Sequence, residues 1–181
     1  MQSALIFLVK TLADLYLLTF LLRFILQWVR ADYHNPLSQF VLRMTSPLVV
    51  PARRLLPSAG GLDVPTLVVL ISLECLVTLA LTRLAGFSLP VTTFFLFVIL
   101  RLVALTLWFY SVALFAYVIL SWFGGRGANP LGMVLAEIIG PVLRPIRRLL
   151  PPIGGLDLSP LLVMLLCQTA IIALRLPWFL G

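Results

Sequence analysis

The sequence predicts an all-α integral membrane protein in which four transmembrane helices form two tandem, parallel repeats, each with an amphipathic Pro/Arg-rich interfacial linker. Two observations support this fold class. Of 181 residues, 62% are hydrophobic and only 10% are charged, with a mean hydropathy of +1.15, whereas soluble domains average roughly 45–50% apolar and about 25% charged residues. The second half of the chain also repeats the first at a constant shift. The composition excludes a soluble enzyme and a disordered chain.

Four apolar segments are long enough to span a membrane, because a bilayer core of roughly 30 Å requires about 20 helical residues. We expect spans at residues 3–28, 66–84, 92–122 and 161–176. The apolar runs are continuous and leave no alternation for a β-barrel wall. The first run has no basic segment before it and is too long for a cleavable signal, so it is expected to be retained.

The repeat defines two units, residues 1–90 and 91–181, with linkers at residues 29–65 and 123–160. Eleven of the 17 residues from Pro47 to Asp63 recur identically 94 residues later, from Pro141 to Asp157. Each unit contains an even number of spans, so both are expected to insert in the same orientation, related by an axis along the membrane normal.

The distribution of arginines predicts the orientation in the membrane. Only Arg83 and Arg175 lie near helix ends on one side, while the linkers on the other side hold eight arginines: Arg30, Arg43, Arg53, Arg54, Arg126, Arg144, Arg147 and Arg148. The linkers are therefore predicted to be cytoplasmic, and both termini periplasmic. The net charge of +7 lies largely beside apolar segments, which favours anionic phospholipid over nucleic acid as a partner.

Each linker begins with a predicted short amphipathic helix. Apolar residues recur at helical spacing at Leu37, Phe40, Val41 and Met44, and again at Leu131, Val134, Leu135 and Ile138. Pro47 and Pro141 are expected to end these helices, because proline lacks the N–H donor. The following segments should lie flat on the interface with their arginines on lipid phosphates, each contributing about 1 kcal/mol; a re-entrant hairpin is the competing geometry. The lipid- or partner-facing candidates are Arg53, Arg54, Arg144, Arg147 and Arg148.

Prolines, glycines and an aspartate recur with these arginines at fixed spacing, which indicates a fixed backbone shape as well as a topology signal. These structural candidates are Pro47, Pro51, Gly60, Gly61, Asp63, Pro141, Pro145, Gly154, Gly155 and Asp157. The glycines would supply positive φ angles at a tight turn. Each aspartate either caps the helix that follows or pairs with a linker arginine, and both interpretations stay open.

The charged residues within the predicted spans include Lys10, Asp14, Glu74 and Arg101. A central charge costs about 2.5–3.5 kcal/mol on insertion scales, so such groups usually pair inside the bundle. Lys10 and Asp14 share one helix face, which leaves Glu74 to pair with Arg101 across the bundle. The repeat does not copy this cluster. It is either a neutral network that fixes helix register or an ion relay.

The sequence carries no constellation that indicates catalysis or a cofactor. His34 is the only histidine, Cys75 and Cys167 lie singly in apolar runs, and no Gly-rich phosphate loop follows a strand. We therefore expect a non-enzyme that uses no metal or cofactor.

The second copy resembles the signature of the YggT family of bacterial inner-membrane proteins, which has relatives in plastids. The matching residues are PVLRPIRRLLP from Pro141 to Pro151 and GGLDLSP from Gly154 to Pro160. The first copy departs from this pattern after Asp63, where Val64 and Pro65 follow. The resemblance covers both halves. It implies roles in assembling membrane complexes, including haem attachment to a cytochrome b subunit, in nucleoid or division-related organisation, and in osmotic stress and ion homeostasis.

These expectations combine into a non-enzymatic scaffold or assembly factor for membrane or envelope complexes, with a link to osmotic stress. Its expected partners are anionic phospholipid and other membrane proteins, and homo-oligomerisation stays open. The alternative is a small transporter or oligomeric channel that uses Lys10, Asp14, Glu74 and Arg101. Since the chain lacks haem ligands, any haem-related role would resemble that of a chaperone.

Overall fold

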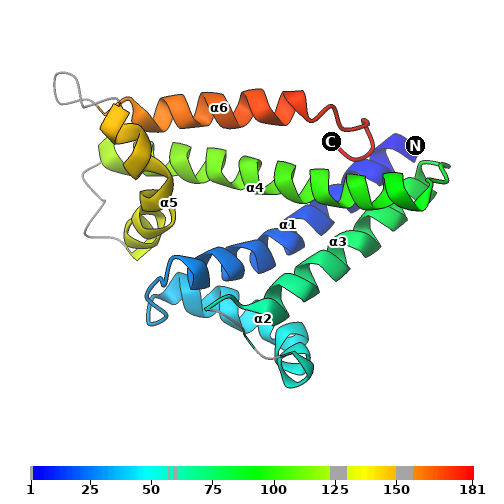
Figure 1. Cartoon of the computed structure of the whole chain (residues 1–181), viewed down its shortest axis with the longest axis horizontal. Coiled ribbons are helices and arrows are strands. Elements are labelled where there is room, and N and C mark those ends of the chain that lie inside the picture. Colours follow the sequence, from blue (N-terminus) through cyan, green and yellow to red (C-terminus); the bar gives the residue numbers. More distant parts are fainter. Residues whose placement is uncertain (1, 57, 59–60, 123–129, 150–156) are drawn as a thin grey trace.

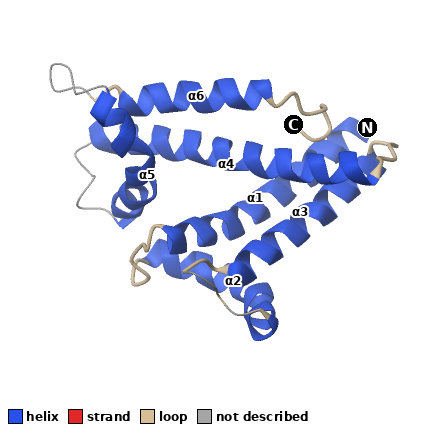
Figure 2. Ribbon diagram, in the orientation of Figure 1, coloured by secondary structure: helices blue, strands red, loops and turns tan. Residues whose placement is uncertain are grey.

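The computed structural model describes residues 2–56, 58, 61–122, 130–149 and 157–181. Within these residues the secondary structure consists of helices joined by loops, without an extended sheet (Figure 2). The helices are, in chain order, α1 (Gln2–Trp28), α2 (Pro36–Leu55), α3 (Val64–Leu84), α4 (Val91–Trp122), α5 (Pro130–Leu149) and α6 (Ser159–Ala173). The expected all-α class is confirmed for the described part of the chain.

The helices form two hairpins that meet at one end of the molecule. α1 packs along α3, and α4 packs along α6. Figure 1 shows both chain termini and the α3–α4 turn at this end, while α2 and α5 lie across the opposite ends of the hairpins. Each half thus consists of a long helix, a shorter transverse helix and a returning helix.

The long helices expose apolar side chains that a soluble protein would bury. α1, α3 and α4 are long and apolar enough to cross a membrane by length and composition. Side chains that are more than half exposed on the four longitudinal helices include Phe7, Leu12, Leu76, Phe95, Ile99, Phe115, Leu165 and Ile172. An apolar surface of this extent marks contact with lipid or with other proteins.

α6 is shorter than its predicted span. The helix has 15 residues and ends at Ala173, although the apolar run was expected to continue to Leu176. Arg175 has a φ of 47°, and Pro177 disfavours helical backbone in the residue before it. The chain then folds back, and Phe179 and Leu180 are buried against Ile6 and Leu81.

The prediction that Pro47 and Pro141 end the linker helices is wrong. α2 continues through Pro47 and Pro51, and α5 through Pro141 and Pro145. An interior proline usually costs about 3 kcal/mol, because it removes a hydrogen bond to the carbonyl four residues earlier. Here all four prolines are exposed, as are the residues four positions before them, so the freed carbonyls lie on the outer side of each helix.

α2 and α5 are buried at equivalent positions, which extends the repeat from sequence to packing. The buried residues of α2 are Ser38, Val41, Thr45 and Val49. Gly132, Leu135, Ile139 and Leu143 of α5 lie 94 residues further on and are also buried. One stripe of each transverse helix therefore packs against the helix bundle.

Of the predicted turn glycines, only Gly61 lies within the described residues, and its φ of +82° is in the left-handed region. Gly60, Gly154 and Gly155 lie outside them. A side chain at position 61 would be strained by this backbone conformation.

Candidate functional site

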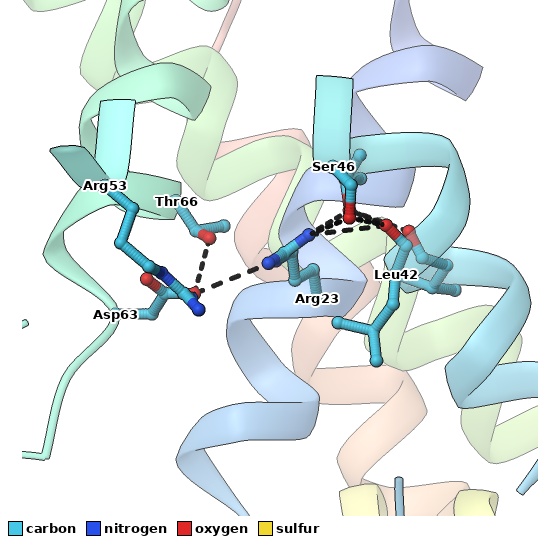
Figure 3. Close-up of polar contacts among 8 residues, drawn as sticks. Arg23, Leu42, Ser46, Arg53, Asp63 and Thr66 are labelled. Carbon is cyan, nitrogen blue, oxygen red and sulfur yellow. Dashed lines mark hydrogen bonds and ion pairs between the residues drawn. The ribbon is translucent and has the colours of Figure 1, made fainter. Parts of the chain in front are cut away.

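Asp63 is the centre of a polar network that joins three helices of the first repeat (Figure 3). Its buried carboxylate oxygen Oδ2 accepts hydrogen bonds from Arg53 Nη2 at 2.9 Å and from Thr66 Oγ1 at 2.6 Å. Arg23 Nε lies 3.7 Å from the same oxygen. Asp63 occupies the N-cap position of α3 but makes no capping hydrogen bond. The structure therefore places it in an ion pair with a linker arginine, not in the capping role.

Arg23 connects this aspartate to α2. Arg23 belongs to α1, and its side chain is buried. Its Nη1 donates hydrogen bonds to Thr45 Oγ1 at 2.8 Å and to the Leu42 carbonyl at 3.4 Å. Figure 3 shows the guanidinium between Asp63 on one side and Leu42 and Ser46 on the other. Arg23 was not among the predicted site residues, because it lies inside an apolar run. Its position within a predicted span could have identified it as a site residue, because charged residues in spans are usually functional or paired.

The second repeat contains the equivalent ion pair. Arg147 Nη2 lies 2.7 Å from Asp157 Oδ2, and Nε donates to the same oxygen at 2.9 Å. The Ser159 backbone N–H donates to Asp157 Oδ1 at 3.0 Å. Asp157 thus combines an ion pair with a hydrogen bond from a backbone N–H. Asp63 instead accepts a hydrogen bond from the side-chain hydroxyl of Thr66. The two copies differ in the residues that follow the aspartate, and this accounts for the different hydrogen-bond donors.

The electrostatics of this second pair favour its charged form. Burial alone would raise the pKa of Asp157, but hydrogen bonds from Ser159 and Arg147 outweigh it and place the pKa below the usual 3.8. Burial alone would lower the pKa of Arg147, but hydrogen bonds with Tyr117 and Asp157 outweigh it and raise that pKa. Tyr117 stands 94 residues after Arg23, so the two copies use different side chains from their first helix to support the pair.

The remaining predicted linker arginines, Arg54, Arg144 and Arg148, are exposed. Arg53 has a side chain that is 48% exposed although it contacts Asp63. The two transverse helices therefore each hold one arginine against the bundle and present others outward. This arrangement suits contact with phosphates or with acidic side chains.

The apolar faces of the two transverse helices differ in burial. Val134 and Ile138 of α5 are each 1% exposed, whereas the equivalent Phe40 and Met44 of α2 are 57% and 45% exposed. The predicted apolar stripe is therefore largely covered by the bundle in α5. In α2 part of it remains open, beside the exposed arginines of the same helix.

The two repeats are also joined through their linkers. Asn35 caps α2 by accepting a hydrogen bond from the Leu37 N–H at 2.9 Å, and its Nδ2 donates to the Pro130 carbonyl of α5 at 2.8 Å. The Asp32 N–H lies 3.4 Å from Glu137 Oε2. α2 and α5 also contact each other directly, so they form one continuous surface at this end of the molecule.

The charges within the spans form a second network, centred on Arg101 of α4. Its Nη2 lies 2.7 Å from Asp14 Oδ1, and its Nε donates to Glu74. Lys10 pairs with Asp14 at 3.1 Å on the same face of α1. The structure thus places Glu74 against Arg101 and Lys10 against Asp14, as the charge pattern predicted, and it adds the Arg101–Asp14 pair.

The C-terminal tail completes this network. Arg101 Nη1 donates to the Leu180 carbonyl at 2.7 Å. Glu74 also accepts a hydrogen bond from Thr78 at 3.0 Å, and its second oxygen is buried without a partner among the described residues. Sequence reasoning missed the carbonyl, because a backbone acceptor in a tail carries no residue-type signal.

A cavity of about 560 Å³ lies beside this network, between α1, α4, α6 and the tail. Lys10, Asp14, Arg101 and Arg175 line it together with apolar residues. Among the described residues, no group of three or more His, Cys, Asp and Glu could hold a metal ion. The cavity lining combines charged and apolar side chains.

Comparison with known proteins identifies relatives along almost the whole chain. The CCB3/YggT family model matches twice, at residues 2–84 and 96–178, and the second match begins 94 residues after the first. An uncharacterized protein of Pseudomonas aeruginosa is 41% identical over 167 residues, covering 91% of this chain and 85% of that protein. The uncharacterized protein YggT of Escherichia coli K12 is 36% identical over 165 residues, covering 91% and 86%. No solved structure matches.

Proposed function

Because the chain belongs to the CCB3/YggT family, we propose that it is a non-enzymatic inner-membrane protein that scaffolds or assists the assembly of membrane or envelope complexes, with a consequence for osmotic tolerance. The relatives named above are themselves uncharacterized, so the proposal depends on the geometry of this chain. Its working surface is the pair of transverse helices, α2 and α5.

One observation carries the proposal: each transverse helix is tied by an ion pair to the helix that follows it. Arg53 holds Asp63, and Arg147 holds Asp157. A helix that only needed to lie on lipid would require no such attachment. Fixing α2 and α5 reduces the conformational entropy that a binding partner would otherwise have to remove, which favours a docking surface.

The proposed topology has four spans, with α2 and α5 at the cytoplasmic interface and both chain ends in the periplasm. In its support, the arginines of the linkers outnumber those at the opposite end of the spans by eight to two. α1, α3 and α4 have sufficient length, and α6 is assigned as the fourth span because it packs along α4.

Site-specific photo-crosslinking in living cells tests the scaffold. A photoreactive residue at Arg54 or Arg148 should capture a defined membrane protein, while one at Arg83, an exposed arginine at the other end of α3, should not. The crosslink should weaken in an Arg53→Gln/Arg147→Gln double variant, because the transverse helices lose their attachment. The scaffold is wrong if the linker positions capture nothing beyond what Arg83 captures, or if the crosslink survives the double variant unchanged.

A second candidate function is transport, either by the single chain or by an oligomeric channel. The cavity lined by Lys10, Asp14 and Arg101 favours it, since ionisable groups within spans are common parts of ion pathways. Flux of ions through liposomes containing the purified protein, abolished by Glu74→Gln, would establish this function. If the liposomes show no flux and the crosslinking experiment captures a partner, the scaffold function is supported instead.

A further inference from the structure

The cavity beside Arg101 is lined by three helices and by the C-terminal tail. The lining residues come from α1, α4 and α6, and we refer to α1 and α6 as its two walls. Both walls pack on α4, but no extensive contact joins them to each other. Leu180 and Gly181 of the tail lie at the end of the pocket near the chain termini. A molecule could enter from the lipid between the two walls.

The lining changes from charged to apolar along the helices. Lys10 and Asp14 of α1 and Arg101 of α4 line the part nearer the chain termini, together with Arg175. Further toward the transverse helices, the lining consists of Leu15, Leu18, Leu105 and Trp108. This order matches an amphiphile whose headgroup lies near the membrane surface and whose chain points toward the bilayer centre.

The charges of the pocket favour an anionic headgroup. Lys10 and Arg101 are already engaged by Asp14, and Glu74 contacts Arg101 from outside the pocket. Arg175 also lines the pocket, and its side chain forms no hydrogen bond or ion pair within the described part of the chain. Among these five side chains, Arg175 is the cation without an acidic partner, and an anion could neutralise it in a site of low dielectric constant.

We propose that this pocket binds one anionic phospholipid of the surrounding leaflet. Its phosphate contacts Arg175 and Lys10, and one acyl chain lies along Leu15, Leu105 and Trp108. A small inorganic anion would leave most of the apolar lining unused, whereas a phospholipid already present at high local concentration fills both parts. This site is distinct from the transverse helices on which the proposed scaffold depends, so either proposal can fail without the other.

Native mass spectrometry of the full-length protein in neutral detergent tests the site, with phosphatidylglycerol as the probe and phosphatidylethanolamine as the zwitterionic comparison. We expect one retained phosphatidylglycerol, bound about tenfold more weakly by Arg175→Gln. Arg175→Lys should retain most of the affinity because it keeps the charge. Arg83→Gln removes another exposed arginine from the same end of the bundle, outside the pocket lining, and should bind as the unmodified protein does.

Trp108 provides a second readout that does not depend on retention in the gas phase. In a variant with Trp28, Trp122 and Trp178 replaced by phenylalanine, phosphatidylglycerol with brominated acyl chains should quench Trp108 fluorescence, and Arg175→Gln should reduce that quenching. Equal binding of the two phospholipids, or an Arg175→Gln variant that binds and quenches normally, would overturn the proposal. Arg175-dependent binding of oleate without binding of phosphatidylglycerol would also overturn it, by assigning the pocket to a free fatty acid.

Discussion

Arg53 and Asp63 join the end of α2 to the start of α3, with Nη2 of the arginine 2.9 Å from Oδ2 of the aspartate. The pair closes the turn between a transverse helix and a membrane helix. Arg147 and Asp157 repeat the contact in the second half, so an ion pair joins the end of each transverse helix to the segment where the next helix starts.

Replacing Arg53 should destabilise the protein more than replacing its neighbour. Arg53→Gln leaves the buried Asp63 carboxylate with one charged hydrogen bond fewer, so we expect the free energy of unfolding to fall by about 1–3 kcal/mol. Thr66 and Arg23 still contact Asp63, which keeps the loss within this range. Arg54→Gln, at an exposed position, is the matched control. Thermal unfolding in detergent measures both, and equal melting temperatures would contradict a role for the pair.

Loss of Arg101 should be among the most destabilising single changes in the spans. Arg101→Gln leaves Glu74 buried without its cation, a loss of about 3–5 kcal/mol for such pairs. Removing both charges, in Glu74→Gln/Arg101→Gln, should cost less than Arg101→Gln alone, because no carboxylate is left uncompensated. A double-mutant cycle on unfolding provides the coupling, and strictly additive losses would show that the two side chains act independently.

Arg101 also limits which charge swaps can restore the network. Exchanging the charges of Glu74 and Arg101 places a glutamate at position 101 next to Asp14, which now contacts the arginine. The swap should therefore remain unstable in the melting assay. Adding Asp14→Asn should recover part of the stability, and full recovery without that third change would contradict the observed Arg101–Asp14 contact.

The ion pair of the second repeat should make stability depend on acidity. The pKa of Asp157 in the folded protein lies below its usual value of 3.8, so the ionised carboxylate stabilises the fold above about pH 4. This contribution is lost as the pH falls through the lower, folded-state pKa. The melting temperature of the unmodified protein should therefore exceed that of Asp157→Asn at pH 6 and approach it near pH 3. A difference that stays constant with pH would contradict this assignment.

Cysteine labelling checks the proposed orientation. In a background with Cys75→Ala and Cys167→Ala, Ser88→Cys in the α3–α4 turn should react with a membrane-impermeant maleimide from the periplasmic side. Arg54→Cys should react only after the inner membrane is opened. Both positions are exposed, so accessibility within the protein does not limit the reaction. The reverse pattern would place the transverse helices in the periplasm.

The sequence predicted the features that depend on residue type and spacing. The shift of 94 residues marked equivalent positions, and Ser38 and Gly132 are buried alike although their side chains differ. Glu74 and Arg101 were expected to pair because an uncompensated charge is costly within a membrane, and they do.

Features that depend on three-dimensional context were not predictable in this way. Pro47 was expected to end its helix. The free-energy cost of a proline inside a helix depends on whether the carbonyl that loses its hydrogen bond lies on an exposed face, and only the packing of the helix decides this. Arg23 was hidden in an apolar run, and its partner Asp63 lies 40 positions further along the chain. The Leu180 carbonyl reaches Arg101 only because the tail turns back at Pro177.

The unequal lengths of α4 and α6 have a consequence for the lipid around the protein. At 1.5 Å per residue, the 32 residues of α4 extend about 48 Å and the 15 residues of α6 about 22 Å, compared with roughly 30 Å of hydrocarbon. On the proposed topology, hydrophobic mismatch therefore has opposite signs at these two helices, although they pack side by side in one hairpin. The bilayer must become thinner next to α6 while α4 tilts, so the protein should favour short-chain lipids beside α6.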